Sequence, residues 1–134
     1  MTVELSPAVR RLFEKPNFAH IATLMPDGSP QVTPVWVDMD GNRILVNTAE
    51  GRVKPRNVRQ DPRVAISVVD QENPYSAAFV RGRVVEVTHE GADDLIDKLA
   101  KKYIGQEKYP WRRPGERRVT LVIEPEQVSA MLAD

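Results

Sequence analysis

The chain has 134 residues with 19 basic and 19 acidic side chains and no cysteine, and this length predicts one domain over residues 1–134 because domains most often contain ~100–150 residues. A formal net charge of zero argues against general binding to nucleic acid or to an acidic membrane, and the lack of cysteine excludes disulfides and thiolate metal sites. Because neither a signal peptide nor the ~20 apolar residues of a membrane span is visible, we expect a cytoplasmic protein.

The first third of the chain predicts a short helix followed by strands. Ser6 and Pro7 supply a helix cap and a first-turn proline, and Pro16 ends the helix. Apolar runs separated by turns that contain Pro, Asp and Gly predict the next strands at residues 18–25, 31–37 and 43–48. With tight turns between them, these strands are expected to form a three-strand antiparallel meander.

The basic segment at residues 47–63 carries the most specific signal. Its pattern predicts strand, loop, short helix, turn and strand. Pro55 is expected at the first helical position, which would leave the amides of residues 56–58 free at the helix start. Free amides, the positive end of the helix dipole and the heads of Arg52 and Lys54 indicate a site for an anion, most naturally a phosphate. The alternative is a solvated basic helix.

The second half of the chain continues with strands and one longer helix. Strands are predicted at residues 64–70, 77–88 and 118–123, with a helix at about 91–104 and a basic loop at 106–115. Both faces of the strands at 18–25 and 31–37 are largely apolar and therefore need cover on both sides. We expect a mainly β protein with some α, in which a closed or split antiparallel β-barrel packs against short flanking helices or against a second subunit of a homodimer.

The titratable side chains do not suggest a side-chain nucleophile or a metal site. His20 lies mid-strand among apolar residues and is interpreted as a core or interface histidine. His89 lies at a strand-to-helix junction and is interpreted as a cap. Neither belongs to a metal-ligand spacing, so no metal ligand and no catalytic residue is predicted.

Several polar and aromatic residues are further candidates for binding. Pro34 cannot donate to a sheet ladder, so its strand is expected to be an edge strand or to be irregular. An irregular strand would leave backbone groups free to contact a flat heterocycle. The alternative is a plain edge strand without a binding role. Thr48 offers a hydroxyl to an anion. Tyr75 and Trp111 lie in predicted loops, whereas Trp36 is more readily interpreted as core. A second basic group could bind an anionic tail or form a solvated rim: Lys108, Arg112, Arg113, Arg117 and Arg118.

In this order, residues 18–36, 51–64, 73–75 and 80–85 resemble the split-barrel flavin-binding superfamily that includes pyridoxamine 5′-phosphate oxidase. More narrowly, the chain resembles the small F420-dependent oxidoreductases, the B group of flavin/deazaflavin oxidoreductases. The resemblance covers nearly the whole chain. It implies a dimer with cofactor sites at the interface, where residues 111–113 would reach the neighbour's cofactor.

The resemblance also implies which residues bind the cofactor. Arg52 and Lys54 would hold its phosphate, with Thr48 and Asn57 assisting, and the strand from residue 31 to residue 36 would lie along the ring. The full set of expected cofactor-binding residues is Gln31, Thr33, Pro34, Val35, Trp36, Val46, Asn47, Thr48, Arg52, Lys54, Asn57, Tyr75, Trp111, Arg112 and Arg113.

The function implied is an F420-dependent reductase that transfers a hydride from reduced coenzyme F420 to an electron-poor small-molecule acceptor. Such a cofactor carries the hard chemical step, which is consistent with the lack of a visible catalytic dyad. The alternatives are an FMN-dependent oxidoreductase of the same fold and a non-catalytic protein that binds a flavin or a tetrapyrrole. Oxidation of vitamin B6 itself is not expected, because no histidine follows His89 to match the substrate-binding arm of pyridoxamine 5′-phosphate oxidase.

Overall fold

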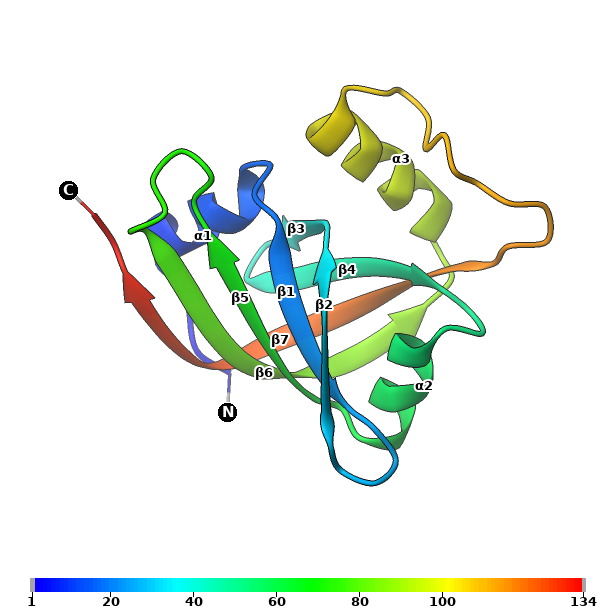
Figure 1. Cartoon of the computed structure of the whole chain (residues 1–134), viewed down its shortest axis with the longest axis horizontal. Helices are drawn as coiled ribbons and strands as arrows, with labels where there is room; N and C mark the ends of the chain where they lie inside the picture. Colours follow the sequence, from blue (N-terminus) through cyan, green and yellow to red (C-terminus); the bar gives the residue numbers. More distant parts are fainter. Residues whose placement is uncertain (1, 134) are drawn as a thin grey trace.

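The computed structural model describes residues 2–133, which form one sheet of seven strands and three helices (Figure 1). The strands are β1 (Ala19–Leu24), β2 (Pro30–Val35), β3 (Val37–Asp40), β4 (Arg43–Ala49), β5 (Arg63–Val69), β6 (Ala77–Thr88) and β7 (Arg118–Met131). The helices are α1 (Pro7–Glu14), α2 (Val53–Gln60) and α3 (Ala92–Ile104).

The sheet is antiparallel, with the strand order β2-β1-β5-β6-β7-β4-β3. β2 and β3 are thus the two edges of the sheet, although Trp36 alone separates them in the chain. The sheet must curl to bring its two edges together there, and Figure 1 shows β1 and β2 crossing in front of β4 and β7. The predicted antiparallel split barrel is confirmed.

The predicted meander is wrong, because the strand expected at residues 31–37 divides at Trp36. β2 pairs with β1 and β3 pairs with β4, but β2 and β3 do not pair with each other. Pro34 lies opposite His20 in β2, and this proline has no N–H with which to continue a ladder on the outer side. The prediction that this strand is an edge is therefore confirmed.

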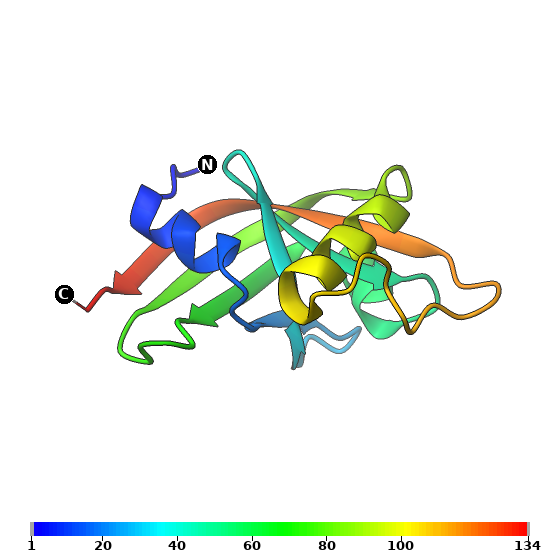
Figure 2. The ribbon, with the colours of Figure 1, turned by 90° about the horizontal axis from the view of Figure 1, so that it is seen from above.

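The helices cover different parts of the curled sheet. α1 begins as predicted, since Ser6 Oγ accepts a hydrogen bond from Val9 N at 3.2 Å. Its buried side chains Val9, Leu12 and Phe13 join the core. α3 packs on β4 and β7, and Figure 2 shows α1 and α3 towards opposite ends of the molecule.

The start of α2 differs from the prediction. The helix begins at Val53 with Arg52 as its N-cap, so Pro55 occupies the third helical position rather than the first. The first turn of a helix needs no intrahelical N–H donors, which lets a proline stand there at no cost in hydrogen bonds. The amides of Val53 and Lys54, and not those of residues 56–58, therefore lie in the first turn.

The two histidine interpretations have different outcomes. His20 is exposed on β1 and is not part of the core, while its alternative place at an interface stays a prediction. His89 does not cap α3, whose N-cap is Gly91; instead His89 Nε2 lies 2.6 Å from Glu50 Oε2. Gly91 has a φ of 74°, which glycine adopts without strain.

Strand β7 runs to Met131, well beyond the predicted end at residue 123. Pro125 falls opposite Gly82, where the β6–β7 register shifts. A proline is tolerated at such an irregularity because no ladder donor is needed there. The extension pairs with the first half of β6, from Ala77 to Arg81, and so lengthens this part of the sheet.

Candidate functional site

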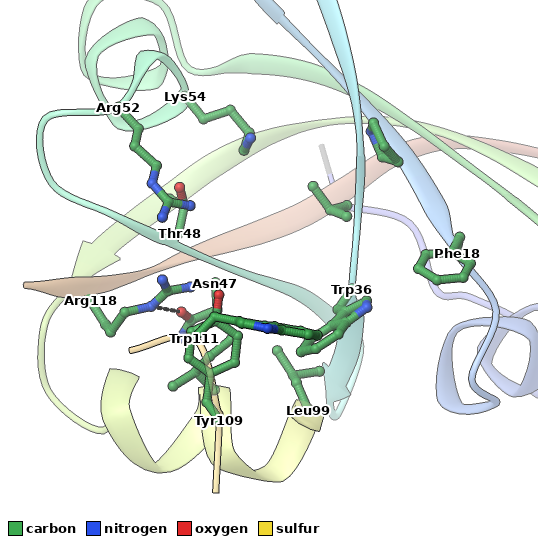
Figure 3. Close-up of a pocket in the computed structure, with 13 residues that line it drawn as sticks. Phe18, Trp36, Asn47, Thr48, Arg52, Lys54, Leu99, Tyr109, Trp111 and Arg118 are labelled. Carbon is green, nitrogen blue, oxygen red and sulfur yellow. Dashed lines mark hydrogen bonds between the residues drawn. The ribbon is translucent and has the colours of Figure 1, made fainter. Parts of the chain in front are cut away.

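A cavity of about 260 Å³ lies beside the joint between β2 and β3 (Figure 3). Its walls come from the residue before β1, the end of β2, the β2–β3 joint, β4, the start of α2, α3, the α3–β7 loop (residues 105–117) and the start of β7. The lining residues are Phe18, Pro34, Val35, Trp36, Asn47, Thr48, Arg52, Lys54, Ile96, Leu99, Tyr109, Trp111 and Arg118. The cavity is slightly smaller than the ~300–1,000 Å³ typical of small-molecule sites.

One end of the cavity is polar and cationic. Lys54 is half-buried, and its Nζ donates to Thr33 Oγ1 at 3.2 Å. Burial, and secondly the nearby charge of Arg52, lower the Lys54 pKa from its ordinary value. No carboxylate in residues 2–133 forms an ion pair with Lys54. The site therefore holds a partly desolvated positive charge without a negative partner.

Thr48 faces the same end of the cavity (Figure 3). Its side chain is buried, with 1 % exposure, yet Oγ1 has no hydrogen-bond partner among the described residues. Buried polar atoms are nearly always paired, because leaving one unpaired costs about 1–3 kcal/mol. An unpaired hydroxyl beside a lysine without a carboxylate indicates a place for an oxygen-rich anion.

A second cation, Arg118, is held rigidly behind this end. Its side chain is 3 % exposed; Nε donates to Asn47 Oδ1 at 2.9 Å and Nη1 donates to Glu116 Oε1 at 3.1 Å. The guanidinium also lies 5.1 Å from the centre of the Tyr109 ring. Arg52 Nη2 reaches the other oxygen of Glu116 at 3.3 Å.

The other end of the cavity is aromatic. Trp36 stacks on Tyr103, with ring centres 5.3 Å apart and planes inclined by 6°. Tyr109 and Trp111 approach Trp36 from the α3–β7 loop at 6.1 and 6.2 Å between ring centres. With Leu99 below them, these rings form an apolar wall suited to a flat ring system.

Eight of the predicted cofactor-binding residues meet at this cavity: Pro34, Val35, Trp36, Asn47, Thr48, Arg52, Lys54 and Trp111. They come from four separate parts of the chain, which the sequence could not bring together without the resemblance. Trp111 lines the cavity of its own chain, and its reach to a neighbour's cofactor stays a prediction.

The other predicted residues lie elsewhere. Val46 is fully buried in the core, and Asn57 is fully buried with its amide donating to Thr23 Oγ1 at 3.0 Å. Tyr75 is 79 % exposed in the β5–β6 loop, away from the cavity. The remaining residues that do not line the cavity are Gln31, Thr33, Arg112 and Arg113.

The second basic group is largely neutralised by carboxylates of the chain itself. Arg112 pairs with Asp93 at 3.0 Å and also with Asp97, and Lys108 lies 3.6 Å from Asp97. The acidic face at the start of α3 thus anchors the α3–β7 loop. This pairing accounts for much of the basic cluster without any bound anion.

Four lining residues were not named as candidates, namely Phe18, Ile96, Leu99 and Tyr109, and a fifth, Arg118, was named only as a member of the second basic group. Tyr109 and Arg118 stand in the basic loop and at the start of its following strand, so their types were visible but their direction was not. Ile96 and Leu99 belong to the apolar stripe of α3, which sequence periodicity assigns to the core.

The comparisons with known proteins agree with this architecture. The family described as pyridoxamine 5′-phosphate oxidase matches residues 5–132. The chain belongs to the pyridoxamine 5′-phosphate oxidase family. The match includes every helix and strand together with the whole lining of the cavity.

Solved structures of similar proteins extend the assignment. A protein named F420 reductase is 32 % identical, with a TM-score of 0.81, and the match covers 93 % of this chain and 98 % of that one. A conserved hypothetical protein from Mycobacterium tuberculosis is 20 % identical, with a TM-score of 0.74 and coverage of 97 % and 86 %. HupZ from Group A Streptococcus is 18 % identical, with a TM-score of 0.69 and coverage of 96 % and 95 %. The last two likenesses show the fold alone.

Family membership and the likeness to F420 reductase point to an oxidoreductase. Among residues 2–133, His, Asp and Glu side chains form no group of three that could hold a metal ion. Over the same residues, no helix has the length and apolar character needed to cross a membrane.

Proposed function

We propose that this member of the pyridoxamine 5′-phosphate oxidase family binds coenzyme F420 and reduces an electron-poor organic acceptor by hydride transfer. The observation that carries the proposal is the pair formed by the unpaired, buried Thr48 hydroxyl and the half-buried Lys54 amine at one end of the cavity. The likeness to F420 reductase supports the choice of cofactor.

A phosphate group fits the polar end by charge and by hydrogen bonding. Its oxygens would accept from Thr48 Oγ1, which lacks a partner, and from Lys54 Nζ, whose positive charge lacks a carboxylate. Arg52, half exposed at the N-cap of α2, can turn towards the same group. The first-turn amides of α2 add the positive end of a helix dipole.

A flat ring system fits the aromatic end. Residues 34–36 and the Trp36 ring form one wall, while Tyr109 and Trp111 form a cover from the loop side (Figure 3). When bound, reduced F420 supplies the hydride, and the chain's residues hold the phosphate, orient the ring and exclude water. No side chain of this cavity needs to act as a nucleophile.

FMN is the second candidate, since it also carries a phosphate and a tricyclic ring. The pair of Thr48 and Lys54 would serve either cofactor, so the preference for F420 rests on the 32 % identity to F420 reductase. A non-catalytic protein that binds a flavin or a tetrapyrrole would use the same cavity but would show no turnover with any acceptor.

We also propose that a second copy of the chain covers the outer face of the sheet. Three large apolar side chains stand exposed there, Val32 at 63 %, Phe79 at 40 % and Val128 at 37 %. They line a shallow groove that runs across β2, β1, β5, β6 and β7. The groove also carries the polar side chains of His20, Ser67, Arg81, Gln127 and Ser129. Large apolar side chains exposed together on one face are typical of an interface, and a homodimer would bury them.

The test is a parallel fluorescence titration of the purified protein with F420 and with FMN, followed by an assay with reduced F420 and a panel of enones and quinones. We expect tighter binding of F420. Replacing Lys54 by Ala should weaken that binding by roughly 1.5–3 kcal/mol, the value of a charge-assisted hydrogen bond. Arg56→Ala is the matched control, because Arg56 lies in the same helix, is exposed and does not line the cavity.

Tighter binding of FMN would reassign the cofactor, and turnover with none of the acceptors would favour the non-catalytic alternative. Equal affinities of the wild type and of Lys54→Ala for F420 would show that this end of the cavity does not bind the phosphate.

A further inference from the structure

Glu116 occupies an unusual place for a carboxylate, between two arginines at the cationic end of the cavity. Its side chain is 7 % exposed, and its two oxygens contact different partners: Oε1 accepts from Arg118 Nη1 at 3.1 Å and Oε2 accepts from Arg52 Nη2 at 3.3 Å. Glu116 itself does not line the cavity, although both of its partners do.

The two arginines differ in their freedom to move. Arg118 is 3 % exposed in its side chain and is fixed by Asn47 and by the ring of Tyr109. The side chain of Arg52 is 48 % exposed, forms no other ion pair within residues 2–133, and lines the polar end of the cavity. A long, half-exposed side chain exchanges partners readily, whereas a buried one does not.

The backbone around Glu116 is also held in place. Glu116 N donates to Arg113 O at 3.1 Å, and Arg117 O accepts from Glu50 N at 2.9 Å. The carboxylate is therefore presented to Arg52 by a fixed segment of the α3–β7 loop. The same loop carries Tyr109 and Trp111, which form the cover of the aromatic end.

We propose that Glu116 is a specificity residue that competes with anionic ligands for Arg52. Without a ligand, the Glu116 carboxylate holds Arg52. An incoming phosphate or carboxylate group takes over Arg52, while Glu116 Oε1 stays with Arg118. Only a ligand whose anionic group binds Arg52 better than Glu116 does can use this cation, so weakly charged ligands are disfavoured. The inference rests on the proposed function only in that the cavity takes an anionic group.

The test is a double-mutant cycle with inorganic phosphate as the probe, measured by NMR titration at constant ionic strength. Glu116→Gln removes the competing charge and keeps an oxygen that can accept from Arg118. We expect it to bind phosphate roughly threefold to fivefold more tightly than the wild type, the upper part of the range for releasing one partly exposed ion pair. In an Arg52→Gln background, the same substitution should change the affinity by less than about twofold.

Glu107→Gln is the matched control, since Glu107 lies in the same loop but pairs with Lys101, outside the cavity. It should leave phosphate affinity unchanged. If Glu116→Gln does not fold, Glu116→Asp replaces it, because a side chain one methylene shorter cannot span both arginines and should also tighten binding.

Each outcome decides the question. Unchanged or weaker phosphate binding by folded Glu116 variants overturns the inference. Equal tightening in the Arg52→Gln background also overturns it, because the carboxylate would then repel phosphate directly and would not compete for Arg52. Phosphate binding by none of the proteins overturns it as well. Tightening of phosphate in a protein that does not bind F420 would support the role of Glu116 and reject the proposed cofactor. F420 binding together with unchanged phosphate affinity in Glu116→Gln would support the proposed cofactor and reject the role of Glu116.

Discussion

The hydroxyl of Tyr103 donates to Asn17 O at 2.6 Å, while its ring stacks on Trp36. The same hydroxyl accepts a hydrogen bond from Val37 N at 3.1 Å. Tyr103 thus joins the last turn of α3 to the start of β1 and to the one residue at which the two edges of the sheet meet. The position of Trp36, and with it one wall of the cavity, depends on this tyrosine.

Replacing Tyr103 by Phe should destabilise the protein by about 1–3 kcal/mol. The ring would remain, but Val37 N and Asn17 O would lose their partner in a part-buried place. Urea unfolding would measure the change. Tyr75→Phe, at an exposed loop position, is the control and should have no effect; equal stability of the two variants would show that the Tyr103 hydroxyl is not a clamp.

Thr48→Val should separate stability from ligand binding. In the ligand-free protein, the substitution removes a buried hydroxyl without a partner, so the free energy of unfolding should stay the same or rise by about 1 kcal/mol. Binding of F420 should weaken by about 0.5–1.5 kcal/mol, because the hydroxyl is then missing from the anion site.

Thr23→Val is the matched control for this experiment. Thr23 is equally buried, but its Oγ1 accepts from Asn57 Nδ2, so this variant should lose stability and keep its ligand affinity. If Thr48→Val loses stability in the same way, the Thr48 hydroxyl has a partner within the chain and its proposed role is wrong.

Lys102 should make stability depend on pH above neutrality. Its Nζ donates to Phe13 O and Val37 O, both at 2.7 Å, and burial lowers its pKa to about 8 from an ordinary 10.5. Between about pH 8 and 10.5 the unfolded chain therefore holds more protons on this residue than the folded chain does. Unfolding must take up a proton in that window, so the contribution of Lys102 to stability rises with pH and is constant below it.

The measurement is urea unfolding of the wild type and of Lys102→Met at about pH 7, 8.5 and 10, which together span this window. Other titrating groups cancel in the difference between the two proteins. We expect the difference to shift in favour of the wild type as the pH rises; a constant difference would mean that Lys102 keeps its ordinary pKa in the folded protein.

Gly82→Ala should be strongly destabilising. A Cβ at this position would lie 2.2 Å from Glu124 O on the neighbouring strand β7, and a backbone oxygen cannot move aside as a side chain can. Gly41→Ala provides the comparison, because Gly41 has a φ of 60° but a Cβ there would meet nothing within 4 Å. This substitution should cost only the strain of a left-handed backbone, about 1–2 kcal/mol. Thermal unfolding should rank Gly82→Ala well below Gly41→Ala, and the opposite ranking would contradict the close approach of β6 and β7.

Phe79→Glu should convert a dimer into a monomer, because a charge would enter the apolar groove on the outer face of the sheet. Sedimentation would report the mass. Ile104→Glu is the control, since Ile104 has a similar exposure of 38 % but lies on α3 outside the groove. A wild type that sediments as a monomer at all concentrations would exclude the homodimer.

Local chemistry predicted those elements whose signals lie within a few residues. The Ser6 cap, the strand Ala77–Thr88 and the helix that ends at Ile104 follow from capping residues, alternation and an apolar stripe. Such signals act between neighbours in the chain and need no tertiary contact, so their prediction was nearly free of error.

Tertiary contacts decided which residues form the site. Composition and pattern by themselves predicted the segments of an antiparallel barrel, the basic segment around Lys54 that we propose as an anion site, and the edge character of Pro34. They could not show that β2 and β3 separate at Trp36, that Asn57 turns into the core, or that Glu116 stands between Arg52 and Arg118. Those outcomes depend on strand pairing and on contacts between residues tens of positions apart, where the curl of the sheet, and not the local pattern, sets which side chains meet.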